Sequence, residues 1–135
     1  MIVFLSCVKQ KRSEPCAARD MYTSDLFKKS LAYALQLKPR EVYILSAKYG
    51  LLELDEKIEP YEQTLNKMRD HERKAWAYRV CKQCEEKGIS YGEKSVFLCG
   101  NNYRKYLMRK FTNAIAPLGN LPIGKQLAFY KNHLM

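Results

Sequence analysis

Three short apolar runs constrain the fold of this chain more than any other feature: Ile2–Leu5, Val42–Leu45 and Val96–Cys99. Each run is rich in β-branched or aromatic residues and is bounded by polar residues, which is typical of a strand buried on both faces. The segments between successive runs are long enough for helical crossovers, so we expect the three strands to lie parallel in one sheet.

Outside these runs, apolar residues at helical spacing predict four helices. Ser24–Leu37 begins with a capping hydroxyl and carries apolar residues at helical spacing. Asn66–Lys87 has a sparser apolar stripe, and further helices are expected over Asn101–Ile115 and about Lys125–Asn132. This order of elements predicts an α/β fold, a small three-layer domain with a mostly parallel central sheet of about three to four strands flanked by helices.

Length and composition limit the class of protein. A chain of 135 residues with 47% hydrophobic residues suits one globular domain spanning residues 1–135 and excludes wholesale disorder. It contains no apolar run of the ~18–20 residues that a membrane span requires. The apolar start lacks a preceding basic segment, so we expect no secretory targeting and no membrane partner. Five cysteines, an odd number, then indicate free thiols in a reducing cytoplasm.

Basic residues exceed acidic ones by 24 to 14, giving a net charge of +10, which points toward a polyanion such as nucleic acid or a nucleotide. The excess is uneven: residues 41–62 contain six acidic and two basic groups, whereas the flanking segments are strongly basic. The stretch Glu53–Glu62 is either a solvated loop, or this acidic segment supplies carboxylates to a site otherwise lined by cations.

The carboxyl ends of the predicted strands are the expected binding site. Right-handed crossovers bring these ends to one edge of the sheet, where open α/β sheets bind ligands. Each end is followed by small hydroxyl, thiol or Gly positions and then by Lys, Asn, Tyr or Arg, a combination that suits a nucleobase, nucleotide or phosphate. The predicted substrate-binding residues are Ser6, Lys9, Lys11, Tyr22, Ser46, Lys48, Tyr49, Gly50, Tyr61, Gly100, Asn101, Tyr103 and Arg104.

Two residues are candidates for catalysis. Glu59, in the acidic segment, is the favoured general acid or base. Cys7, at a strand end, is either a nucleophile or an inert buried thiol. The pair Cys81 and Cys84 lies inside a predicted helix, where Cys84 is expected to pack and Cys81 to take no part. With no second such pair and no phosphate- or dinucleotide-binding motif, we expect no metal and no cofactor.

Six segments together resemble an uncharacterised family of small bacterial and phage proteins. The resemblance covers nearly the whole chain, and its most specific part is the block around Ser46–Leu52 followed by the Ile-Glu-Pro-Tyr motif. The segments are Ser6–Lys11, Ala18–Phe27, Ile44–Leu52, Ile58–Leu65, Phe97–Arg104 and Pro117–Leu127.

The middle block is also similar to YaaA-type peroxide-stress proteins, which are associated with DNA. A looser similarity links Ser6, Cys7 and Ser46–Gly50 to the uracil-DNA-glycosylase-like domain of archaeosine synthase. In this chain Leu5 stands where that domain has Pro, and no Asp or His of a glycosylase site can be placed. The resemblance implies an α/β scaffold used around nucleic-acid bases.

Three functional hypotheses follow. The first is an enzyme that acts on a nucleobase or its N-glycosidic bond, with lysines and Arg104 holding phosphate and tyrosines stacking on the base. The second is a non-catalytic DNA- or RNA-binding protein that uses the basic residues of helix 66–87. The third is a phage nucleotide-binding accessory protein.

Overall fold

A mixed five-stranded sheet forms the centre of the computed structural model, which describes residues 1–7 and 11–135. The strands are β1 (Ile2–Ser6), β3 (Glu41–Ser46), β4 (Gly50–Glu53), β6 (Ser95–Leu98) and β7 (Ala114–Ile115), in the order β4-β3-β1-β6-β7. β1 pairs in parallel with both β3 and β6, β7 is parallel to β6, and β4 alone is antiparallel. The prediction of a mostly parallel sheet is confirmed, with two short strands beyond the three that the apolar runs indicated.

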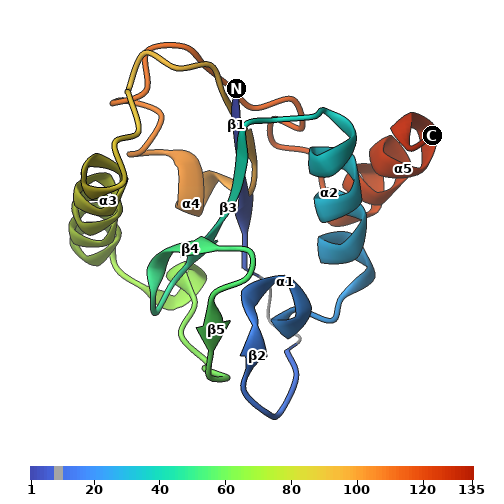
Figure 1. Ribbon diagram of the computed structural model, residues 1–135, viewed down its shortest axis with the longest axis horizontal. Coiled ribbons are helices and arrows are strands. Elements are labelled where there is room, and N and C mark those ends of the chain that lie inside the picture. Colours follow the sequence, from blue (N-terminus) through green and yellow to red (C-terminus); the bar gives the residue numbers. More distant parts are fainter. Residues whose placement is uncertain (8–10) are drawn as a thin grey trace.

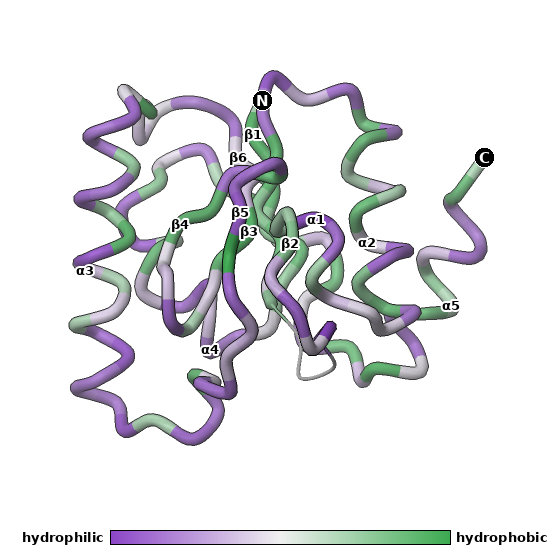
Figure 2. The backbone as a smooth tube through the Cα atoms, turned by 60° about the horizontal axis from the view of Figure 1, so that its bottom comes forward, coloured by the Kyte–Doolittle hydropathy of each residue, from purple (hydrophilic) through white to green (hydrophobic). Residues whose placement is uncertain are grey.

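Helices cover both faces of this sheet and make three layers (Figure 1). α2 (Asp25–Gln36) and α5 (Ile123–His133) pack on one face, and α3 (Asp70–Glu86) and the short α4 (Asn101–Arg104) on the other. The sparse stripe of α3 is visible in Figure 2, where most of its length is hydrophilic. None of the helices in the described part of the chain is long and apolar enough to cross a bilayer.

The core is built around β1, whose residues Ile2–Leu5 are all almost completely buried. The ring of Phe4 stacks on Phe97 of β6 at 4.8 Å between centroids, and Phe111 closes the cluster edge-on at 5.4 Å from Phe4. Burying each such side chain stabilises the fold by about 1.5–3 kcal/mol. The three apolar runs of the sequence are therefore the three central strands.

The prediction of a helix over Asn101–Ile115 is wrong beyond its first turn. The chain forms α4, continues through turns to Lys110 and ends in β7. Phe111 is drawn into the core, and the Ser95 backbone N–H donates to the Asn113 carbonyl at 3.0 Å, which lays the chain along β6. The helical spacing of the apolar residues is satisfied here by turns around the core.

The two long loops after β1 and β4 are joined by a second, two-stranded sheet. β2 (Cys16–Ala17) pairs antiparallel with β5 (Lys57–Ile58), and α1 (Ala18–Met21) follows β2 directly. A bridge between Lys11 and Tyr22 closes the first loop on itself. Sequence periodicity could not show these elements because two residues carry no period.

A tight turn connects β3 to β4. Ser46 Oγ accepts a hydrogen bond from the Tyr49 backbone N–H at 3.0 Å, and Gly50 follows with φ +77°. Gln83 of α3 clamps the turn, because its Oε1 accepts from the Leu51 N–H at 2.8 Å and its Nε2 donates to the Tyr49 carbonyl at 3.0 Å. The Gln83 amide thus joins the hairpin to α3, together with Trp76, whose Nε1 donates to the Ser46 carbonyl at 2.9 Å.

This clamp makes Gly50 difficult to replace. In Gly50→Ala, an ideal Cβ would lie 2.2 Å from Gln83 Oε1 at a φ that L-residues avoid. We expect a loss of about 2–3 kcal/mol of unfolding free energy from backbone strain and lost hydrogen bonds, measured by denaturant titration. The control is Gly124→Ala in α5, where nothing lies within 4 Å and the helix should gain stability. Equal stabilities of the two variants would contradict the clamp.

Candidate ligand cavity at the strand ends

A cavity of about 720 Å³ opens at the carboxyl ends of β1 and β6. Its floor comes from the strand ends, one wall from α2 and α5, and the other from the segment of residues 61–67. This is the sheet edge at which the sequence predicts ligand binding. Among the predicted residues, those that line the cavity are Ser6, Cys7, Lys11, Tyr61, Gly100, Asn101 and Tyr103.

The residues predicted after β3 lie elsewhere, because β4 returns the chain immediately in a hairpin. Ser46 is fully buried and caps that hairpin turn, and Lys48 is exposed on it with its ammonium 5.2 Å from the Tyr49 ring centre. Tyr49 Oη accepts from the Glu59 backbone N–H at 3.2 Å, and Gly50 faces Gln83. These four residues build the hairpin and do not line the cavity.

Three other predicted residues also do not line the cavity. The side chain of Glu59 is exposed outside the cavity, and Tyr22 lies buried behind Tyr61. Arg104 is buried and donates to the Cys99 carbonyl at 2.7 Å and to Asn120 Oδ1 at 2.9 Å, so it ties the end of β6 to the loop before α5. Lys9 lies outside the described residues.

A cluster of phenol and thiol groups forms the inner end of the cavity. Tyr103 Oη accepts hydrogen bonds from Cys7 Sγ and from the Leu65 backbone N–H, both at 3.3 Å. The hydroxyls of Tyr22 and Tyr61 are hydrogen-bonded to each other at 2.5 Å. These bonds connect the end of β1 to α4 and to the segment after Tyr61, and they fix the shape of the cavity wall.

Burial keeps these phenols neutral. It raises the pKa of Tyr22, Tyr61 and Tyr103 well above the ordinary value, and negative charge on the neighbouring Cys7 would raise it further. Burial also lowers the pKa of Lys11, against the opposing influence of Cys7 and Glu62. The Lys11 ammonium lies 4.6 Å from the centre of the Tyr61 ring, a cation–π contact. The cluster therefore offers neutral hydrogen-bonding groups beside one cation.

Sequence reasoning missed most of the polar groups near the mouth of the cavity, although it predicted Asn101. Glu62 lines it in place of Glu59, and carboxamides come from three separate segments of the chain. The motifs of the resemblance leave positions 62, 63 and 102 open, and although they include Gln126 they do not place it at the strand ends. The carboxamide residues are Gln63, Asn66, Asn101, Asn102 and Gln126.

The described cysteines are all free thiols. Cys84 is completely buried, as predicted, and burial raises its pKa to about 12. Cys81, expected to be a bystander, is also buried. No group of three or more His, Cys, Asp or Glu side chains in the described part of the chain could hold a metal ion.

A family model covers almost all of this architecture, matching residues 2–132. The chain belongs to DUF6884, a family of unknown function. The matched range includes every strand of the central sheet and every residue that lines the cavity, so the cavity lies wholly within the family's common segment. No curated protein and no solved structure gave a significant match to this DUF6884 chain.

The hydrogen bond between Tyr22 and Tyr61 should be measurable as a coupling energy. Each single Tyr→Phe variant removes this bond from a buried hydroxyl and should lose about 1–3 kcal/mol of unfolding free energy. The double variant should lose less than the sum, with a coupling of about 1 kcal/mol in a denaturation cycle. Tyr78→Phe, at a ring that is 66% exposed, is the control and should change stability by less than about 0.5 kcal/mol. Strict additivity would contradict the bond.

Proposed function

We propose that the cavity at the ends of β1 and β6 binds a nucleobase, either free or as part of a nucleotide or nucleic acid. The observation that carries this proposal is the convergence of carboxamide side chains from three segments on a cavity walled by aromatic rings. A volume of about 720 Å³ is within the range of about 300–1,000 Å³ that small-molecule sites occupy.

Carboxamides suit the edge of a base because each offers both a donor and an acceptor. Asn102 Nδ2 donates to Asn66 Oδ1 at 2.8 Å, and Gln126 Nε2 donates to the Leu121 carbonyl at 2.7 Å, so these amides are held in place. No hydrogen bond occupies the side chains of Gln63 and Asn101 within the described residues, and both are available to a ligand.

The aromatic walls and cations favour the same ligand. Tyr61 and Tyr103 on one side and Phe27 and Tyr130 on the other give the cavity faces against which a planar ring can pack. Lys11 and Lys67 supply positive charge for a phosphate. Glu62 is the carboxylate that lines the same cavity.

The proposal includes catalysis of a reaction of the bound base. Glu62 takes the general acid–base role that the sequence assigned to Glu59, because it lines the cavity and Glu59 does not. Cys7 lies at the inner end of the cavity, where its thiol donates to Tyr103. The relationship to YaaA-type proteins and to the archaeosine synthase domain also remains a proposal, resting on the segments around Ser46–Leu52 and Ile58–Tyr61.

The alternative, nucleic-acid binding through the basic residues of the helix over 66–87, has less support. α3 carries four acidic and four basic residues and is neutral as a whole. Arg73 donates to the Leu65 carbonyl at 2.8 Å and Arg79 to the Lys48 carbonyl at 3.0 Å, so both arginines hold neighbouring loops. Phosphate contacts on this helix would therefore depend on its lysines rather than on its arginines.

Direct binding tests this proposal. Calorimetric titration with the common nucleobases, nucleosides and mononucleotides should show one saturable site. Gln63→Ala and Asn101→Ala should each weaken binding by about 3- to 10-fold, the effect of one lost hydrogen bond. Asn132→Ala, an exposed amide of α5 outside the cavity, is the matched control and should bind normally. Absence of binding by every compound in the series would overturn the proposal.

An activity assay distinguishes Glu62 from Glu59 as the general acid or base. Incubation with nucleosides and with short oligonucleotides, followed by chromatography of the released or altered base, should give product that depends on Glu62. We expect Glu62→Gln to slow product formation by about 100-fold, a common effect of removing a general acid or base, and Glu59→Gln to leave it unchanged. A rate that depends on Glu59 but not on Glu62 would contradict the assignment.

A further inference from the structure

A second pocket, of about 300 Å³, lies between α3 and the segment that follows α4. We propose that this pocket, which we call the α3 groove, binds the backbone and an unstacked base of a single-stranded nucleic acid. The inference rests on the proposed function and deepens it: the base in the cavity would belong to a strand rather than to a free nucleotide. The groove residues that carry the argument are Lys74, Tyr78, Lys82, Tyr91, Tyr106 and Lys110.

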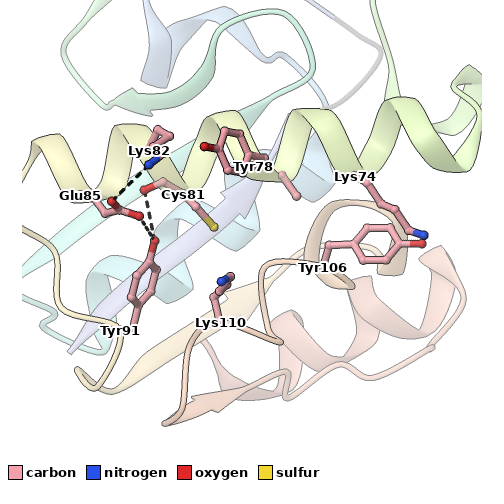
Figure 3. A pocket seen from close by; sticks show the side chains of 9 residues that line it. Lys74, Tyr78, Cys81, Lys82, Glu85, Tyr91, Tyr106 and Lys110 are labelled. Carbon is pink, nitrogen blue, oxygen red and sulfur yellow. Dashed lines mark hydrogen bonds and ion pairs between the residues drawn. The ribbon is translucent and has the colours of Figure 1, made fainter.

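Lysines and tyrosines alternate along this groove (Figure 3). Lys74, Tyr78 and Lys82 are four residues apart on α3 and so occupy one face of the helix, and Tyr106 and Lys110 face them from the opposite side. Tyrosine rings offer stacking faces that any base can use, and lysines between them can contact phosphates, which is how sequence-tolerant single-strand sites are built.

The positive charge of the groove is only partly balanced, with Lys74 paired with Asp70 at 3.4 Å. Glu85 is the one carboxylate that lines it, and its Oε2 already accepts from Tyr91 Oη at 2.6 Å. Lys82 lies 3.9 Å from the same carboxylate. Across the groove, no carboxylate of the described residues forms an ion pair with Lys105, Arg109 or Lys110. An anionic ligand would therefore find uncompensated cations on the facing wall.

Three cationic side chains lie close to the ring of Tyr106. The cationic groups of Lys74, Lys105 and Arg109 lie 5.5, 5.2 and 4.8 Å from its centre, while its hydroxyl donates to Asp70. Such cation–π contacts at an exposed site are worth only about 0.5–1 kcal/mol. A phosphate can therefore draw the flexible side chains away and leave the ring face to a base.

The groove and the cavity lie on either side of two segments that are hydrogen-bonded to each other, residues 66–70 and 102–106. The Tyr106–Asp70 bond borders the groove, and the Asn102–Asn66 bond borders the cavity, so the same two segments form a wall of each. A strand lying in the groove would pass over these segments for a flipped base to reach the cavity. The groove cations would then add to the positive charge that Lys11 and Lys67 supply in the cavity.

The test compares matched charge and ring variants by fluorescence anisotropy of a labelled single-stranded 12-mer. Neutralising two groove cations in Lys74→Gln/Lys110→Gln should lower the slope of log affinity against log salt by about 1.4, the effect of two lost phosphate contacts. Tyr78→Ala should weaken binding by at least about 5-fold through lost stacking. The charge control is Lys38→Gln/Lys94→Gln, which removes the same two charges at exposed lysines outside both pockets and should lower the slope less.

Three outcomes would overturn the α3 groove as a strand site: no binding of the 12-mer at low salt, equal losses in the groove variant and in Lys38→Gln/Lys94→Gln, or equal affinity for duplex of the same length with no effect of Tyr78→Ala. The same variants should bind mononucleotides normally, because the cavity is intact. If mononucleotides bind but the groove variants leave strand binding unchanged, the inference fails and the proposed function stands. If strands bind through the groove and no mononucleotide binds, the cavity proposal fails.

Discussion

The parallel pairing of β1 on both of its sides is the constraint on which the rest of the structure depends. Ile2–Leu5 are buried between two layers of helices, and their backbone groups pair with β3 on one side and β6 on the other. Because both neighbours are parallel to β1, the chain must leave all three strands at the same edge. Ser6, Cys7 and Gly100 reach the cavity for this reason alone.

The folded chain shows where the carboxylates of the acidic segment, residues 41–62, lie. Glu53 pairs with Lys87 at 3.6 Å and Asp55 with Arg19, contacts at the surface that each contribute no more than about 1 kcal/mol. Glu62 is the one acidic residue of the segment that lines the cavity. Its part from Glu53 to Glu62 is therefore mostly solvated, with a single carboxylate at the candidate site, so each of the two interpretations of the sequence describes part of it.

The central strands could be predicted from their continuous apolar runs, as β1, β3 and β6 show, and α2 from the helical spacing of its apolar residues. The hairpin to β4 could not, because Leu51 and Leu52 continue an apolar block whose direction is set by a turn and by Gln83 from a distant helix. That reversal is what removes Lys48 and Tyr49 from the cavity. Amides such as Gln126 were invisible for a similar reason, since only tertiary contact brings α5 over the strand ends.

The central claim is that the cavity at the ends of β1 and β6 recognises a nucleobase. The most direct measurement is a titration of ¹⁵N-labelled protein with a mononucleotide, followed through the side-chain amide signals of Asn and Gln. The account predicts progressive shifts of the Gln63, Asn101 and Asn102 side-chain amides, with Asn132 unmoved. Shifts confined to groups outside the cavity, or no shifts at saturating nucleotide, would contradict it.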